Sequence, residues 1–319
     1  MALAIKINQM TPEMERFLEG EIDLVREIIK ANTRSKFSGI KDVVGDIIDL
    51  NGKLLRPLFA IVAAQFGTYQ SDKITKLAAS VEVLHMATLI HDDIIDDSKL
   101  RRNRESVQSK YGKDMAVYAG DYLLSKAMSM LNADDYDADH MKKLARAIEM
   151  ICESELLQYH SKFKSMTVKN YLRVISGKTA ALFAVSMFSG ASESECPEPL
   201  SKTLGKIGYE LGMAFQIIDD ILDFSEQVDV VGKTLRNDLK KGYYTLPVIY
   251  AIQKEKLVDG ELSEPALMLL IEKNKGIEQA KALAKKYTDR ANKRIKNLPE
   301  CESKEVVKGL SELLLNRKY

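Results

Sequence analysis

The chain has 319 residues, with 47 Lys and Arg against 46 Asp and Glu, so its net charge is +1 at pH 7. This balance excludes bulk attraction to nucleic acid or to an anionic membrane, and local basic clusters must bind any phosphate. Three widely spaced cysteines favour neither a disulfide framework nor a cysteine metal site. With no signal-peptide core and no apolar run near the ~20 residues of a bilayer span, we expect a cytoplasmic protein with no nucleic-acid partner and no stable membrane insertion.

Apolar residues recur at helical spacing along most of the chain, as at Val81 and Leu84, in a long apolar helix that begins near Ser71. The stretch from Ser189 to Pro199 carries a glycine and two prolines and predicts a loop between two helices. No strand pattern alternates with the helices, and Pro and Gly are few, which favours long uninterrupted elements. We therefore expect an all-α fold, a single large bundle of ten or more long helices, with residues 1–319 as one domain.

Two acidic clusters have the same spacing. Asp92-Asp93-Ile94-Ile95-Asp96 lies at the end of the long apolar helix, and Asp219-Asp220-Ile221-Leu222-Asp223 repeats it. The first and last carboxylates of each cluster are one helical turn apart and can reach a common ion, although such like-charge pairs disfavour a helix by roughly 0.2–0.5 kcal/mol. A single acidic cluster would be interpreted as a helix end exposed to solvent. Two identical clusters, each flanked by apolar residues, indicate instead the hard oxygen ligands that bind Mg²⁺. The predicted metal ligands are Asp92, Asp93, Asp96, Asp219, Asp220 and Asp223.

Short basic groups occur along the chain, and two of them closely follow the acidic clusters. Glycine allows close approach to a ligand, and Lys and Arg donate to phosphate oxygens. The two Gly-Lys-Thr triplets lack the earlier glycine and the preceding strand of a P-loop. Together the groups predict phosphate binding, and they are Lys53 to Arg56, Arg101-Arg102, Gly177-Lys178-Thr179 and Gly232-Lys233-Thr234.

The order of these motifs resembles that of the trans-isoprenyl diphosphate synthases, from about Gly52 to Ala251. The matching residues are Gly52-Lys53-x-x-Arg56-Pro57, His85, Leu89 to Asp93, Asp96-Asp97, Arg101-Arg102, Gly120 to Leu123, Gly177 to Ala180, Gln216, Asp219-Asp220, Asp223, Gly232-Lys233, Asp238-Leu239 and Thr245-Leu246-Pro247. The resemblance implies an isoprenoid synthase-like bundle around a deep central cavity, usually as a homodimer.

The resemblance also implies an activity. Up to three Mg²⁺ ions, which Mn²⁺ can replace, clamp an allylic diphosphate such as farnesyl or geranylgeranyl diphosphate while isopentenyl diphosphate adds to the carbocation. The implied catalytic residues are Asp92, Asp96, Asp219, Lys178, Lys233 and Arg101. The implied substrate-binding residues are Arg101, Lys178, Thr179, Gln216 and Lys233 for the allylic diphosphate, and Lys53, Arg56, His85 and Arg102 for isopentenyl diphosphate.

The chain departs from the family pattern in three places. Asn103 to Ser106 replace the usual Gly-x-Pro-Thr, and Arg236 stands at a customary glycine. Lys241 occupies a commonly acidic position and Tyr243 a commonly basic one. The change at Tyr243 removes one expected diphosphate contact, for which Lys240 and Lys241 are the candidate replacements.

Two residues predict the product length. Ala87 and Thr88 lie about one turn before Asp92, where short-product members of the family carry aromatic rings. A small floor admits a longer tail, and we expect a product of about C30–C40, the size of quinone side chains. The first half of the chain most resembles the catalytic subunits of bacterial heptaprenyl diphosphate synthases, which work with a second subunit, so a heterodimer is an alternative to the homodimer.

Three other functions are weighed against this one. A shorter-chain synthase, with a C15 or C20 product, would share all the motifs. A non-catalytic or regulatory subunit of a heteromeric synthase would tend to lose the acidic motifs, and both are intact here. A class I terpene cyclase generally carries an Asn/Asp-x-x-Ser/Thr-x-x-x-Glu motif in place of the second cluster, which this chain does not.

Overall fold

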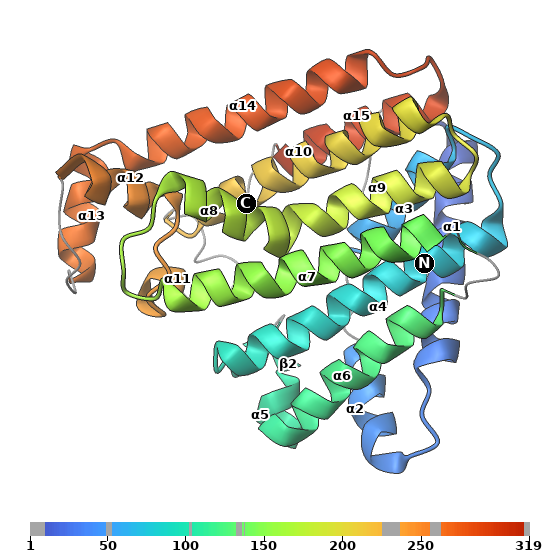
Figure 1. Cartoon of the computed structure of the whole chain (residues 1–319), viewed down its shortest axis with the longest axis horizontal. Coiled ribbons are helices and arrows are strands. Elements are labelled where there is room, and N and C mark those ends of the chain that lie inside the picture. Colours follow the sequence, from blue (N-terminus) through green and yellow to red (C-terminus); the bar gives the residue numbers. More distant parts are fainter. Residues whose placement is uncertain are drawn as a thin grey trace. The chain divides into compact units, whose positions relative to one another are not determined.

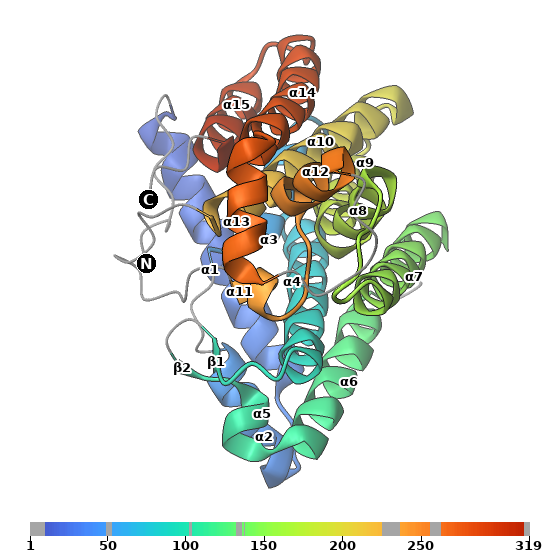
Figure 2. The same ribbon diagram turned by 90° about the vertical axis from the view of Figure 1, so that its left-hand side faces the viewer.

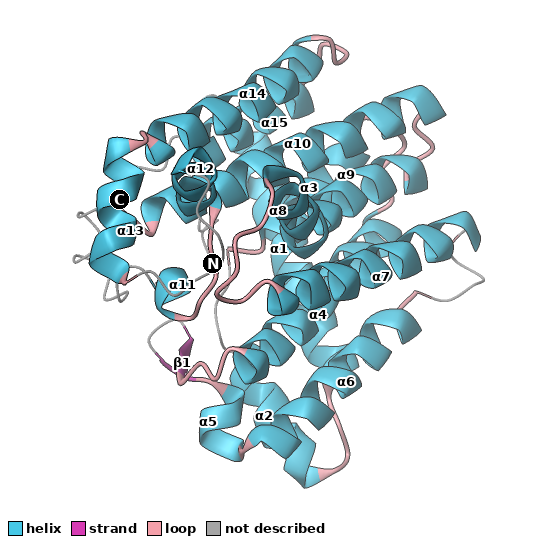
Figure 3. Cartoon of the chain, turned by 60° about the vertical axis from the view of Figure 1, so that its left-hand side comes forward, coloured by secondary structure: helices cyan, strands magenta, loops and turns pink. Residues whose placement is uncertain are grey.

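The computed structural model describes residues 10–48, 53–101, 104–131, 136, 138–224, 237–255 and 263–315. Nearly all of this part of the chain is helical (Figure 3). Its strands are the short antiparallel pair β1 (Leu100–Arg101) and β2 (Arg104–Glu105), formed where the sequence departs from the family loop. The predicted all-α class with ten or more helices is confirmed.

The chain divides into two compact units. The first comprises Met1–Lys142, Ser186–Leu204 and Pro299–Val307, and the second comprises Lys143–Val185, Gly205–Leu298 and Lys308–Tyr319. The single domain over 1–319 and the deep central cavity stay predictions. Four helices contribute residues to both units, namely α7 (Ala138–His160), α9 (Ala181–Glu193), α10 (Glu198–Leu222) and α15 (Glu302–Leu315).

The central helix of the first unit is α4. The helices of this unit are α1 (Pro12–Thr33), α2 (Ser38–Ile48), α3 (Leu55–Ala64), α4 (Ser71–Ile95), α5 (Val107–Tyr111) and α6 (Lys113–Ser129). Helix α4 packs against α1, α3 and α6 (Figure 1). Residues on nearly every side of α4 are buried, from Ile74 to Ile90, as expected of a helix enclosed by neighbours. This packing holds the helix end that carries the first acidic cluster.

The second unit has its own apolar core. Its elements are α7 (Ala138–His160), most of which belongs here, α8 (Val168–Ile175), the π-helical turn η1 (Ser176–Ala180), α11 (Asn237–Lys240), α12 (Leu246–Glu255), α13 (Glu264–Lys273) and α14 (Gly276–Lys296). Helix α12 packs against α13 and α14 (Figure 2). Met213, Ile217 and Ile221 of α10 are buried in the same core as Leu246 and Ile249 of α12. The core therefore anchors the end of α10 that carries the second acidic cluster.

The predicted loop from Ser189 to Pro199 is wrong at both ends. Helix α9 continues to Glu193, and α10 begins at Glu198. Gly190 lies inside α9. No larger residue fits there, because a Cβ atom would lie 2.1 Å from the carbonyl oxygen of Ala60 on α3. This glycine permits close helix packing and does not break the helix.

One helical stretch, Val168–Glu193, is long and apolar enough to cross a membrane by length and composition. This finding corrects the expectation that no apolar run approaches that length. Within the structure, 72% of its most apolar window is buried. The core helix of a globular protein has the same properties.

We expect Gly190→Ala to destabilise the fold. The added methyl group has no room against Ala60, and overpacking of this kind costs about 1–3 kcal/mol. The matched control is Gly20→Ala in α1, where a Cβ atom would meet nothing within 4 Å and where alanine gains roughly 0.5–1 kcal/mol of helix propensity. Urea unfolding of the two variants measures both effects, and equal free energies of unfolding would contradict the packing role of Gly190.

Candidate active site

The first acidic cluster lies at the C-terminal end of α4. Asp92 is in the last turn, Asp96 is the first residue after the helix, and the amide of Asp96 donates to the carbonyl oxygen of Asp92 at 2.9 Å. Both side chains are half-buried. A helix C-terminus carries partial negative charge, so two carboxylates there favour a nearby cation.

Asp93 has a different environment from its neighbours. Its side chain is 6% exposed, and Arg101 of β1 binds both of its oxygens, through Nε at 2.7 Å and Nη2 at 2.7 Å. Such a two-pronged pair fixes orientation as well as charge. Asp93, which we grouped with the metal ligands, therefore ties the β1 strand to α4, and Asp92 and Asp96 are the more accessible carboxylates.

Gln108, which sequence reasoning missed, supports the same helix end. Its Nε2 donates to the carbonyl oxygen of Asp93 at 2.8 Å and to that of Ser98 at 2.9 Å. The last carbonyls of a helix lack intrahelical partners, and Gln108 satisfies one of them. Nothing in the sequence around Gln108 distinguishes it from a surface glutamine, because the contact depends on how α5 packs.

His91 precedes the first cluster and contacts α6. Its Nε2 lies 3.3 Å from a carboxylate oxygen of Asp121. A Cβ atom on Gly120 would lie 2.3 Å from the same nitrogen, so the imidazole occupies the space that a side chain would need. Gly120 and Asp121, which belong to the family motif, thus fix the position of His91, the residue before Asp92.

The second acidic cluster repeats the arrangement of the first. Asp219 lies in the last turn of α10, Asp223 follows its end, and both are half-buried. Asp220 is buried, and it accepts hydrogen bonds from the Tyr171 hydroxyl at 2.6 Å and from Gln216 Nε2 at 2.8 Å. Burial, with the nearby Asp238 carboxylate, raises the pKa of Asp220 well above its ordinary value. As in the first cluster, the second aspartate is held by the scaffold.

The Gly-Lys-Thr triplet forms the π-helical turn η1 between α8 and α9. Such turns are rare and often occur at functional sites. A Cβ atom on Gly177 would lie 1.8 Å from Ser154 Oγ, so only glycine allows this close approach to α7. Thr179 Oγ1 donates to Gln216 Oε1 at 2.6 Å, which links the turn to Asp220.

The ammonium group of Lys178 points to α7. It lies 3.0 Å from Glu155 Oε1 and donates to Gln158 Oε1 at 3.0 Å. Its side chain is 29% exposed and that of Glu155 is 18% exposed, so both remain accessible to a ligand. These two partners on α7 were not predicted, since they lie about twenty residues away in the sequence.

The remaining predicted residues lie in both units. Lys53 is exposed before α3, and Arg56 is half-buried in its first turn. Leu54 between them has φ +47°, a left-handed conformation that is uncommon for a residue with a side chain. In the first unit with the first cluster are Lys53, Arg56, His85, Ala87, Thr88 and Arg101, and in the second unit with the second cluster are Lys178, Thr179 and Gln216. Arg102, Lys233 and Arg236 lie outside the described residues.

Carboxylate chemistry fits a magnesium site, although in the described ranges no three His, Cys, Asp or Glu side chains are arranged to hold a metal ion. Each cluster offers two accessible carboxylates at a helix C-terminus. Mg²⁺ commonly takes one or two protein carboxylates and completes its shell with water and substrate phosphate. The donor set is therefore of the kind that binds the metal together with a phosphate ligand.

The chain is similar to known proteins over most of its length. Residues 38–287 match the family model of polyprenyl synthetase. The chain is 33% identical over 324 residues to heptaprenyl diphosphate synthase component 2 of Bacillus subtilis, covering 98% of this chain and 93% of that protein. It is 29% identical to octaprenyl diphosphate synthase of Escherichia coli, covering 85% and 88%. The crystal structure of heptaprenyl diphosphate synthase from Staphylococcus aureus aligns with a TM-score of 0.87 and 32% identity, over 94% of this chain and 98% of that one.

The chain belongs to the polyprenyl synthetase family. It is accordingly a prenyltransferase of the isoprenoid synthase fold, a prenyl diphosphate synthase.

Asp220→Asn should remove the loss of folding stability that ionisation of the buried Asp220 carboxyl causes as pH rises. Because the native pKa of Asp220 is raised above the unfolded value of about 3.9, the carboxyl favours folding at low pH and this advantage is lost as pH rises towards the native pKa, by about 1.4 kcal/mol per unit. Asparagine does not titrate, so the variant's stability relative to the native protein should increase between pH 4 and pH 7.

Urea unfolding at several pH values measures this difference. Asp72→Asn, at the exposed N-terminal end of α4, is the control and should show no such increase. A stability difference for Asp220→Asn that stays constant with pH would show that the buried carboxyl is already ionised.

Proposed function

We propose that this chain condenses isopentenyl diphosphate with farnesyl or geranylgeranyl diphosphate to give a long all-trans polyprenyl diphosphate of about C30–C40, releasing diphosphate. The observation that carries this proposal is the small pair before Asp92. Ala87 is 1% exposed and Thr88 is half-buried, with its hydroxyl donating to the carbonyl oxygen of His85 at 2.8 Å. Thr88 lies on the same face of α4 as Asp92, one turn further from the helix end. The Bacillus subtilis and Escherichia coli relatives are named for heptaprenyl and octaprenyl products, which lie within this length.

Asp92, Asp96 and Asp219 are the proposed ligands of Mg²⁺, or of Mn²⁺ in its place, with Asp223 one turn from Asp219. When bound, the metal neutralises the negative charge that develops on the departing diphosphate. Asp93 and Asp220 act beside them by keeping each cluster in place, because both are buried and hydrogen-bonded to the scaffold.

The basic residues are proposed to bind the two diphosphates. Arg101, Lys178 and Lys233, with Thr179 and Gln216, serve the allylic diphosphate, and Lys53, Arg56, His85 and Arg102 serve isopentenyl diphosphate. Lys178 is already oriented by Glu155 and Gln158, so its ammonium needs little reordering to reach phosphate oxygens. Cationic donors stabilise the diphosphate that leaves as the allylic C–O bond breaks to give a carbocation. The isopentenyl double bond attacks this carbocation to form the new C–C bond, and the resulting cation loses a proton to the released diphosphate. No side chain acts as a nucleophile.

We also propose a cytoplasmic dimer. Val117 and Tyr118 of α6 are exposed, at 40% and 64%, and such apolar side chains on one helix suit a protein interface. The name component 2 of the Bacillus subtilis relative points to a second subunit in that enzyme. For this chain we propose a homodimer, with a catalytic role in a heterodimer as the alternative.

Product analysis tests the chain length. The purified protein, with isopentenyl diphosphate, farnesyl diphosphate and Mg²⁺, should give products of about C30–C40 on chromatography, and Thr88→Phe should shorten them by filling space near the floor. Activity that appears only when a second subunit is added would indicate the heterodimer. Elongation that ends at geranylgeranyl diphosphate in the native protein would refute the long-chain proposal.

The acidic clusters are tested by Asp92→Ala and Asp219→Ala. Each should lower the elongation rate by about a hundredfold or more, because the charge on the leaving diphosphate loses its partner. Asp72→Ala, at the opposite end of α4, is the control and should retain the native rate. Circular dichroism establishes that the variants are folded, and native rates in both cluster variants would exclude the proposed metal site.

A further inference from the structure

Lys162 lies in the turn between α7 and α8 and is held by two aromatic rings. Its Nζ is 4.8 Å from the centroid of the Tyr243 ring and 5.3 Å from that of Tyr159. Across the described part of the chain this ammonium has no carboxylate partner, whereas that of Lys178 is paired with Glu155. An ammonium held by ring faces is oriented without being neutralised, so its charge remains available to an anion.

The position of Lys162 is fixed by backbone contacts. The amide of Phe163 donates to the carbonyl oxygen of Gly242 at 2.8 Å. Gly242 has φ +83°, and a Cβ atom there would lie 2.6 Å from the Phe163 ring, so only glycine lets the two turns meet. The turn that carries Lys162 is therefore joined to the turn that carries Tyr243.

That second turn adjoins the second acidic cluster. The amide of Tyr243 donates to the carbonyl oxygen of Asp238 at 2.8 Å. The Asp238 carboxylate is close enough to Asp220 and Tyr171 to interact electrostatically with both. Lys162 and Tyr243 thus belong to the same group of packed segments as Asp220, the buried aspartate that holds the second cluster in place.

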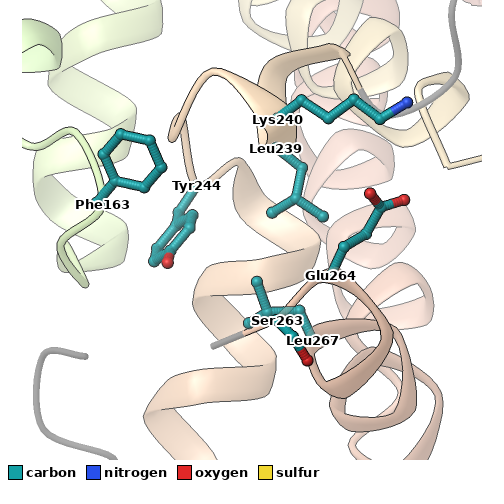
Figure 4. Close-up of a pocket in the computed structure, with 7 residues that line it drawn as sticks. All are labelled: Phe163, Leu239, Lys240, Tyr244, Ser263, Glu264 and Leu267. Carbon is teal, nitrogen blue, oxygen red and sulfur yellow. The ribbon is translucent and has the colours of Figure 1, made fainter. Parts of the chain in front are cut away.

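Lys240, a candidate replacement for the basic residue missing at Tyr243, is less well placed than Lys162. It is exposed, and Figure 4 shows its side chain extending away from Phe163 and Tyr244. It lies at the rim of a pocket that Leu239, Tyr244 and Leu267 line with apolar surface. Tyr244 lines this pocket, while the ring of the preceding Tyr243 lies against Lys162.

We propose that Lys162, held on the Tyr243 ring, donates to the diphosphate of the allylic substrate and supplies the positive charge that the departure at Tyr243 removes. This assignment rests on the proposed function of the second cluster. The lysine comes from a different segment of the chain but reaches the same turn, so a cation and an aromatic ring together replace one basic side chain. Tyr243 is a positioning residue in this arrangement.

Binding of inorganic pyrophosphate with Mg²⁺, measured by calorimetry on the full chain, tests the proposal alongside KM values for both substrates. Lys162→Ala should weaken pyrophosphate binding and raise KM for the allylic substrate by about tenfold, with KM for isopentenyl diphosphate unchanged. Lys164→Ala is the matched control, since Lys164 is exposed on the same turn, and it should behave as the native protein. Adding Tyr243→Lys to Lys162→Ala should restore binding.

The possible results distinguish failure of the Lys162 assignment from failure of the proposed function. If the native protein elongates its substrate but Lys162→Ala binds pyrophosphate as tightly as the native protein, Lys162 has no part in binding. An equal loss in Lys164→Ala, or no recovery with Tyr243→Lys in a folded double variant, also refutes the assignment. If the native protein neither elongates nor binds pyrophosphate, the proposed function itself is wrong.

Discussion

Repulsion between carboxylates at a helix C-terminus is the constraint around which each acidic cluster is built. Each acidic cluster places three aspartates where the helix dipole is already negative, an arrangement that costs stability without a cation. In each cluster the scaffold binds the second aspartate, which leaves the first and last more accessible. Arg101 and Gln108 support the first cluster, and Tyr171 and Gln216 support the second.

The two supports use different chemistry for the same purpose. Asp93 is held by a guanidinium in a two-pronged ion pair, whereas Asp220 is held by the neutral hydroxyl and amide groups of Tyr171 and Gln216. Burial without a compensating cation is why the pKa of Asp220 is raised. The two clusters therefore hold the equivalent aspartate with a compensating positive charge in the first and without one in the second.

The elements were predictable where local pattern determines them. Apolar periodicity indicated α4, and the first acidic cluster lies at the end of this helix, as predicted. The loop prediction at Gly190 was wrong because glycine can either break a helix or allow close helix packing. Only the contact with Ala60, which the sequence does not show, distinguishes the two roles. Gln108, Glu155 and Lys162 were missed because their partners are set by tertiary packing, which leaves no local signal.

The π-helical turn between α8 and α9 has a consequence for insertions and deletions. A π turn contains one residue more than an α turn, and each residue of an α-helix turns the chain by about 100°. Its present register lets Lys178 contact α7 while Thr179 contacts α10. Deleting one residue here would preserve an unbroken helix but rotate one of these side chains away from its partner. At this turn the number of residues is therefore as strictly constrained as their identity.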